Sequence, residues 1–241
     1  MKSNKLSLEV WGDLACFSNP VMKVERFSYE IITPSAVRGI FEAIYWKSKF
    51  RWQITAIEIL KKPQYIALRR NEVKDKIPSH SAILRWADGL EDPEPILADG
   101  DSSLLGTDQK GRTQRQTMAL KDVRYRIQAE IRPWPEYEME LPAMEAQFRR
   151  RAKAGQCIYQ PFLGCREFPA FFTLYEGDIK GSDLIPEKNI GWMLYDVFDL
   201  SHPGNTMDFP SVSVFHAQVF NSILRVPEYD SDHVRKPERS V

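Results

Sequence analysis

Residues 123–132, VRYRIQAEIR, decide the fold class, because apolar and polar side chains alternate along the whole stretch. The odd-numbered residues from Val123 to Ile131 are apolar, and the even-numbered residues from Arg124 to Arg132 are polar or charged. Successive side chains of a strand point to opposite faces, so one face of this strand packs on a core and the other meets solvent. That pattern is typical of an antiparallel sheet.

Two strands and a helix are predicted upstream of this stretch. Lys5–Trp11 (KLSLEVW) and Gln53–Leu60 (QITAIEIL) alternate in the same way. Between them, Thr33 is a suitable N-cap, and Pro34 to about Lys47 carries apolar residues at helical spacing. Gly12-Asp13 indicates a loop after the first strand. The resulting β-α-β order is the first half of a ferredoxin-like unit.

A second helix and three strands are predicted downstream. The helix begins near Pro142 and ends before Gly155, a residue type that favours the position after a helix. Its apolar stripe consists of Leu141, Met144, Phe148 and Ala152. Buried strands are expected at Phe168–Tyr175 and Gly191–Leu200, and a weaker strand at Val212–Val219. The predicted fold class is therefore α+β, with one antiparallel sheet and two helices.

The chain is expected to consist of a first domain over residues 1–160, a β-rich portion over 161–227 and a flexible polar tail over 228–241. Residues 73 to 115 interrupt the first domain. They lack sustained periodicity and are rich in Pro, Gly, Ser and Asp, which indicates a long insertion. Within it, residues 88–101 (DGLEDPEPILADGD) carry only acidic charges.

The overall composition excludes several classes of protein. With 43% hydrophobic and 27% charged residues in 241, the chain can form a core and is not a disordered tail. Its three cysteines form no CxxC pair, which indicates reduced thiols and a cytoplasmic location. No apolar run approaches the roughly 20 residues that span a bilayer, so no membrane contact is expected. The net charge is zero, because 33 basic residues balance 33 acidic ones, but basic residues gather in 45–76 and 110–153.

Several side chains in these basic segments are candidates for contact with an anion. Tyr45 ends the first helix, where its phenol either packs at the helix end or reaches a phosphate or a ribose hydroxyl. Guanidinium groups match phosphate oxygens bidentately, and the candidates are Arg69, Arg70, Arg112, Arg115, Arg149, Arg150 and Arg151. Each group also has a plainer explanation as solvated charge, and cations at 149–151 suit a helix C-terminus.

Other chemistry finds little support in the sequence. The four histidines (His80, His202, His216 and His233) have no partner at metal-ligand spacing, and no cofactor-binding motif occurs, so neither metal nor cofactor is expected. Cys165 follows a glycine and precedes Arg166, which would lower its pKa. A thiol-dependent small-molecule enzyme is therefore a remote alternative, although no base is placed to activate the thiol.

Five segments together resemble one family in order and spacing. They are LEVWGDLACFSNPVMKVERFSYEIITPSAVRGIFEAIYWK, RRNEV, LKDVRY, FRRRAKAGQ and FLGCREFPA. The chain resembles the fifth CRISPR-associated (Cas) protein family, subtype d, of type I-C systems, from about Leu6 to about Tyr175. The resemblance implies a ferredoxin-like (RRM-related, RAMP superfamily) core, in which residues 73–115 would be a thumb that pairs with a neighbouring subunit.

The family resemblance also implies a function. Such a protein is a subunit of the crRNA-guided Cascade surveillance complex, grips the 5′ handle of the guide RNA and contacts the backbone and large subunits, through which target DNA is reached. The subtype also cuts precursor crRNA without a metal, by attack of a ribose 2′-OH on the adjacent phosphate. The residues expected to bind RNA are Arg38, Lys47, Arg69, Arg70, Arg112, Arg115, Arg124, Arg126, Arg149, Arg150, Arg151 and Arg166.

The catalytic residues of the family are matched only in part. The family tyrosine at the end of the first helix corresponds to Tyr45, but Ala143 and Met144 stand where the family has a Lys-His pair. Two hypotheses follow. Either the chain cleaves RNA, with Tyr45 assisted by Lys47, Lys121 or an arginine of 149–151, or it only caps the handle while another nuclease matures the guide.

Overall fold

The computed structural model describes residues 3–22, 25–93, 96, 102–107, 109–202 and 211–237. The chain forms two compact units, one made of residues 1–66 and 118–241, the other of residues 67–117. No helix in the described ranges is both long and apolar enough to cross a bilayer.

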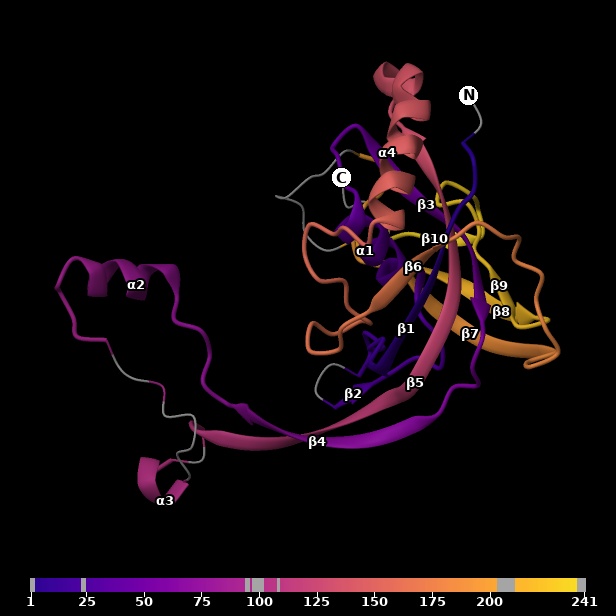
Figure 1. Cartoon of the computed structure of the whole chain (residues 1–241). Coiled ribbons are helices and arrows are strands. Elements are labelled where there is room, and N and C mark those ends of the chain that lie inside the picture. Colours follow the sequence, from indigo (N-terminus) through magenta and orange to yellow (C-terminus); the bar gives the residue numbers. More distant parts are fainter. Residues whose placement is uncertain are drawn as a thin grey trace. The chain divides into compact units, whose positions relative to one another are not determined.

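The elements follow one another in a mixed order along the chain (Figure 1). They are β1 (Leu6–Ala15), β2 (Arg26–Phe27), α1 (Pro34–Ile44), β3 (Phe50–Ile59), β4 (Tyr65–Val73), α2 (His80–Ala87), α3 (Ser102–Leu105), β5 (Arg112–Pro133), the 3-10 helix η1 (Pro135–Glu140), α4 (Leu141–Lys153), β6 (Phe171–Tyr175), β7 (Glu187–Asp196), β8 (Ser213–Phe220), β9 (Ile223–Arg225) and β10 (Val234–Arg235).

The strands belong to one sheet with the order β10-β8-β9-β3-β5-β1-β6, and β2, β4 and β7 pair outside this path. The α+β class with a large antiparallel sheet is therefore confirmed: β5 pairs antiparallel with both β1 and β3. Tyr125 lies opposite Val10 on one side and Ile59 on the other. The stretch that predicted the sheet is thus the C-terminal half of its long central strand.

The first strand is longer than expected, and the predicted loop at Gly12-Asp13 is wrong. β1 continues to Ala15, because β5 continues to pair with it as far as Leu120. A Cβ at Gly12 would lie 2.5 Å from the Leu163 side chain and 2.8 Å from the carbonyl oxygen of Pro169. The glycine therefore permits a close approach of another segment rather than a turn.

The helices α1 and α4 form the core with one face of the sheet. Phe41 of α1 and Phe148 of α4 both contact Trp52 of β3, with ring centroids 4.8 and 5.0 Å apart, and all three side chains are buried. The predicted stripe of α4 is buried as expected, and Gly155 follows the helix with a φ of 65°. α1 begins at Pro34 as predicted but ends at Ile44, because Tyr45 is already extended.

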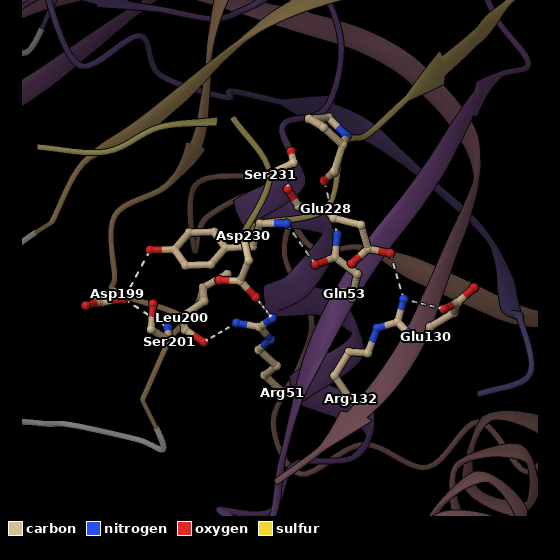
Figure 2. A network of polar contacts seen from close by, with 12 residues as sticks. Arg51, Gln53, Glu130, Arg132, Asp199, Leu200, Ser201, Glu228, Asp230 and Ser231 are labelled. Carbon is tan, nitrogen blue, oxygen red and sulfur yellow. Dashed lines mark hydrogen bonds and ion pairs between the residues drawn. The ribbon is translucent and has the colours of Figure 1, made fainter. Parts of the chain in front are cut away.

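The other face of the sheet is less open than the alternation predicted. Gln128 and Glu130, expected to meet solvent, are buried. The segment after Pro227 lies over this end of the sheet, where Gln53 donates to the carbonyl oxygen of Pro227 at 3.2 Å and accepts from the Tyr229 amide at 3.2 Å (Figure 2).

The flexible tail predicted after Pro227 is therefore wrong for the described residues. Tyr229 is only 1% exposed, and β10 pairs with β8. Figure 2 shows Arg51 bonding Asp230 of this segment and, separately, the carbonyl oxygen of Leu200. Residues 238–241 lie outside the described residues.

The remaining differences lie at strand ends and in the insertion. β6 is shorter than predicted and half exposed rather than buried, because it is the last strand on its side of the sheet order. The insertion, whose sequence shows no sustained periodicity, contains α2, which Ser79 caps by accepting from the Ala82 amide at 3.2 Å. The acidic stretch 88–101 falls partly outside the described residues.

Candidate nucleic-acid interface

Tyr45 lies where α1 ends and the chain turns toward β3. Its amide donates to the carbonyl oxygen of Phe41 at 2.9 Å, and its own carbonyl oxygen accepts from Trp52 Nε1 at 3.0 Å. The ring stacks on Phe50, with centroids 5.4 Å apart. Backbone and ring are therefore fixed by neighbours, while the phenol oxygen has no hydrogen-bond partner among the residues that the structure describes.

The electrostatic surroundings of Tyr45 keep its phenol protonated. Burial raises the pKa of Tyr45, and the carboxylate of Glu140 raises it further, whereas Lys49 and Arg151 lower it. Lys49 forms an ion pair with Glu140 at 2.7 Å and lies 4.8 Å from the centre of the Tyr137 ring. A neutral phenol beside two cations can donate a proton or a hydrogen bond to an anion, but it is a poor base.

Lys49, Tyr137 and Glu140 were not predicted. They come from the loop after α1 and from η1, which are far apart in the sequence. The run PEYEMEL, which contains Tyr137 and Glu140, comes soon after the long strand and could have been noticed in the sequence. Its sequence does not indicate, however, that this segment packs beside the end of α1.

The three consecutive arginines at the end of α4 point to different surroundings. Arg151 Nε donates to the carbonyl oxygen of Ile44 at 2.5 Å, so it joins the ends of α1 and α4. Arg150 is exposed and bonds Gln147 at 3.0 Å. Arg149 is half exposed and has no ion-pair partner within the described ranges. Only Arg149 and Arg150 are thus placed to meet an external anion.

The two lysines predicted beside Tyr45 lie in different places. Lys47 is exposed two residues after Tyr45. Lys121 lies on β5 opposite Leu14, whereas the end of β5 near Tyr45 is marked by the Phe50–Pro133 pair. Twelve residues of strand separate Lys121 from Pro133, which is about 40 Å along the strand. Lys121 is therefore not brought to Tyr45.

The positions of the missing Lys-His pair are also clear. Ala143 is exposed near the start of α4, and Met144 is 2% exposed within the core stripe. Neither side chain can take or give a proton.

Arg38 is a structural residue rather than a surface contact. Its guanidinium is bidentate to Asp196 at 2.6 and 3.1 Å and also pairs with Glu42 at 2.7 Å. The Arg38 side chain is 11% exposed and that of Asp196 is 1% exposed. The pair of carboxylates raises the pKa of Arg38 against the effect of burial. Arg38 is not available to RNA in this arrangement, contrary to the prediction.

Arg124 and Arg126 lie on the face of the sheet that the helices leave uncovered. Both are paired with acids: Glu9 accepts from both, and Glu58 accepts from Arg126 at 3.3 Å. Burial opposes the ionised form, but the two arginines lower the pKa of Glu9 overall. Their charges are therefore largely neutralised within the protein.

Four further predicted residues belong to the smaller unit. β4 and the start of β5 pair there as a two-stranded ribbon. Glu72 accepts from Arg70 at 2.9 Å and pairs with Arg115 at 3.3 Å, so these two arginines face each other across an acid. Arg69 and Arg112 are exposed on the ribbon.

Arg166 and Cys165 lie in the loop before β6. Arg166 is exposed and has no ion-pair partner among the described residues. The neighbour of the thiol is Arg26, 3.7 Å from Cys165 Sγ, rather than Arg166. A hydrogen bond to Cys16 and burial raise the pKa of Cys165, contrary to the prediction, which disfavours the thiolate that a cysteine nucleophile needs. Within the described residues, no three His, Cys, Asp or Glu side chains cluster closely enough to hold a metal.

Comparison with known proteins identifies the family of the chain. The model of the family described as CRISPR-associated protein (Cas_Cas5), subtype Cas5d, matches residues 5–227. The chain belongs to the Cas5d family. Within the Cas5d family, it is 37% identical to a protein of Mannheimia succiniciproducens, with 97% of this chain and all of that one aligned. It is 34% identical to a protein of Thermus thermophilus over 92% of this chain and 91% of that one. Both relatives are named CRISPR pre-crRNA endoribonuclease Cas5d.

Two solved structures share the fold. One is a CRISPR-associated protein, 17% identical with a TM-score of 0.59, and the other a functionally uncharacterized protein from Streptococcus mutans, 16% identical with a TM-score of 0.61. Each covers 98% of this chain and of its own length. At these identities the likeness concerns the Cas5d fold alone.

Proposed function

We propose that this chain binds precursor crRNA and cleaves it, with Tyr45 as a catalytic residue. The observation that carries the proposal is the phenol itself: it is held rigidly at the end of α1, has no hydrogen-bond partner among the described residues, and lies near Lys49 and Arg151. The relatives named pre-crRNA endoribonucleases support the choice of RNA as substrate. The order β6-β1-β5-β3 with two covering helices supports a ferredoxin-like core.

In the proposed reaction, a ribose 2′-OH attacks the adjacent phosphorus and the 5′-oxygen of the next nucleotide leaves. The products are a 2′,3′-cyclic phosphate and a 5′-hydroxyl, so the 2′-OH proton passes to solvent and a proton reaches the leaving oxygen. Tyr45 is suited to donate that proton or to bond a phosphate oxygen, because its raised pKa keeps it neutral. Lys47, which is exposed two residues after Tyr45, stabilises the negative charge of the phosphorane.

Because Ala143 and Met144 provide no acid or base, the expected rate of RNA cleavage is low. Losing one acid/base group costs about 10²–10⁴-fold in rate. We therefore expect slow, single-turnover cleavage, which is compatible with a protein that keeps its product as the guide of a larger complex.

The second candidate function, which Ala143 and Met144 favour, is a handle-binding subunit that does not cleave. It would bind the same RNA through Arg149, Arg150 and Arg166 while another nuclease matures the guide. In either case the backbone and large subunits of a Cascade complex are the proposed protein partners, and the unit of residues 67–117 is the proposed contact with a backbone subunit.

The deciding experiment incubates the purified chain with an end-labelled repeat RNA from its own CRISPR array in EDTA. Tyr45→Phe removes only the phenol oxygen, and Tyr175→Phe is the matched control, because Tyr175 bonds the carbonyl oxygen of Asp178 elsewhere. Cleavage at one position, ending in a cyclic phosphate and lost only in Tyr45→Phe, supports the nuclease. Salt-sensitive binding of intact RNA supports the second candidate, and no binding contradicts both.

A further inference from the structure

A groove on the C-terminal strands lies apart from the Tyr45 site. It has a volume of about 460 Å³, and its lining residues come from β8, from β9 and from the loop that carries Lys180. His216, Gln218 and Phe220 of β8 and Arg225 of β9 line it. A second hollow of about 290 Å³ shares His216 and Arg225 and continues to His233. Together they form one surface, which we call the β8–β9 groove.

The sheet itself separates the groove from Tyr45. Arg225 lies opposite Ala56 and Ile223 opposite Glu58, so both face the side of the sheet that carries Glu58. Tyr45 stacks on Phe50, on the side that α1 and α4 cover. Phe50 and Ala56 are six residues apart on β3, about 20 Å along the strand. One bound nucleotide cannot occupy both sites.

The charge of the groove is positive. Its lining contains Lys180 and Arg225, and no Asp or Glu among the described residues lines either hollow. Arg225 is exposed and has no acidic partner in the described part of the chain. Glu58, which lies opposite Ile223, is buried and already accepts from the Gly181 amide at 2.9 Å and from Arg126. Glu187 borders one end, opposite Phe220.

Exposed aromatic rings border the same cations. Trp192 is 47% exposed and Phe220 50% exposed. The Trp192 ring meets the His216 ring edge to face at 5.8 Å, and Arg235 lies 4.3 Å above its centre. Unpaired cations beside exposed aromatic rings are the combination that single-stranded nucleic acids recognise, the cations contacting phosphates and the rings stacking on bases.

From this combination we infer that the β8–β9 groove binds a second single-stranded polynucleotide through its phosphates, independently of cleavage at Tyr45. Arg225 and Lys180 contact the phosphates, His216 and Gln218 donate hydrogen bonds, and Trp192 and Phe220 stack on bases. The inference goes beyond the proposed function and does not require it.

The test measures binding of fluorescent single strands of about twelve nucleotides, U-only RNA and T-only DNA, to the full chain between about 50 and 200 mM salt. Arg225→Glu is compared with Lys62→Glu, which makes the same charge change at an exposed lysine outside the groove. We expect Arg225→Glu to weaken binding about tenfold and to reduce the slope of log K against log salt by about 0.7. Lys62→Glu should change neither. Equal losses in the two variants would overturn the inference.

A photo-cross-linker at Phe220 locates the strand directly. Phe220→p-benzoylphenylalanine should cross-link to the labelled strand, and Arg225→Gln in the same chain should reduce the yield. Preference for RNA or for DNA identifies the source of the strand, whereas no cross-link to either contradicts the inference.

Cleavage of repeat RNA by Arg225→Glu should equal that of the wild type, and its loss would assign the groove to the Tyr45 site. If the wild type does not cleave RNA, the proposed nuclease activity is contradicted, but the cross-link still tests whether the β8–β9 groove binds a strand.

Discussion

Arg151 donates a hydrogen bond from Nε to the carbonyl oxygen of Ile44, at 2.5 Å, across 107 residues of sequence. The last turn of a helix leaves carbonyl groups without intrahelical partners, and a guanidinium satisfies one of them here. Because Ile44 is the last residue of α1 and directly precedes Tyr45, this bond fixes the backbone from which the Tyr45 side chain extends.

Arg151→Ala should therefore lower both stability and cleavage. Loss of a charge-assisted hydrogen bond costs about 1.5–3 kcal/mol of unfolding free energy, measurable by urea unfolding. The RNA cleavage rate should fall further than a stability loss of that size explains, because Tyr45 loses its position. Arg150→Ala, which removes only an exposed bond to Gln147, should leave the unfolding free energy unchanged. Equal stability losses in the two variants would contradict the role of Arg151.

The Arg38–Asp196 pair should matter for stability and not for RNA. Asp196→Asn removes the buried acid of a nearly buried ion pair and leaves the guanidinium with Glu42 alone, which costs up to about 3–5 kcal/mol. Arg38→Met should destabilise the chain for the same reason, since Asp196 keeps its charge. Thermal and urea unfolding measure both losses. An Arg38→Met variant of normal stability and weakened RNA binding would restore the original prediction for this residue.

The salt dependence of RNA binding should separate the paired arginines from the unpaired one. Each phosphate contact contributes about 0.7 to the slope of log K against log salt for a single strand. Arg149→Ala should lower the slope by that amount, whereas Arg124→Ala should not, because Glu9 holds Arg124. The slopes follow from titrations of labelled handle RNA at several salt concentrations. A lower slope for Arg124→Ala would mean that RNA displaces Glu9.

Alkaline pH should destabilise the fold. Burial raises the pKa of Tyr125 and of Tyr195, and it raises the pKa of Tyr229 to about 12. A folded pKa above the unfolded value contributes stability below about pH 10 and loses it as pH rises above that value. The melting temperature should stay level toward pH 9 and fall above about pH 10 as tyrosinate absorbance appears. A melting temperature that is unchanged while the buried tyrosines ionise would refute this explanation.

The pH profile of cleavage tests the role of Tyr45 separately. If its neutral phenol donates a proton or a hydrogen bond, the single-turnover rate should not fall until the pH exceeds about 10. Glu140→Gln removes a charge that raises the pKa of Tyr45, so the fall should begin at lower pH in that variant. A profile that Glu140→Gln leaves in place would assign the alkaline limb to another group.

Local patterns in the sequence were enough to predict the elements that build the core. The alternation in residues 123–132 identified the C-terminal half of β5, and the spacing from Leu141 to Ala152 identified the buried stripe of α4. Thr33 and Gly155 marked the start of one helix and the end of the other. These signals are reliable because side chains at a fixed spacing along a strand or helix share one face, and that face packs on the core. The five segments that resemble the Cas5d family were also sufficient to identify it.

Only the tertiary structure decided which charges remain available. Arg38, Arg124 and Arg149 look alike in the sequence, yet Asp196 and Glu9 neutralise the first two from positions more than a hundred residues away. The same holds for Lys121, which the length of β5 separates from Tyr45, and for Tyr229, which the sheet buries. The physical reason is range: periodicity reflects contacts between an element and its core, whereas ion pairing depends on which distant segments the fold brings within a few ångströms of each other.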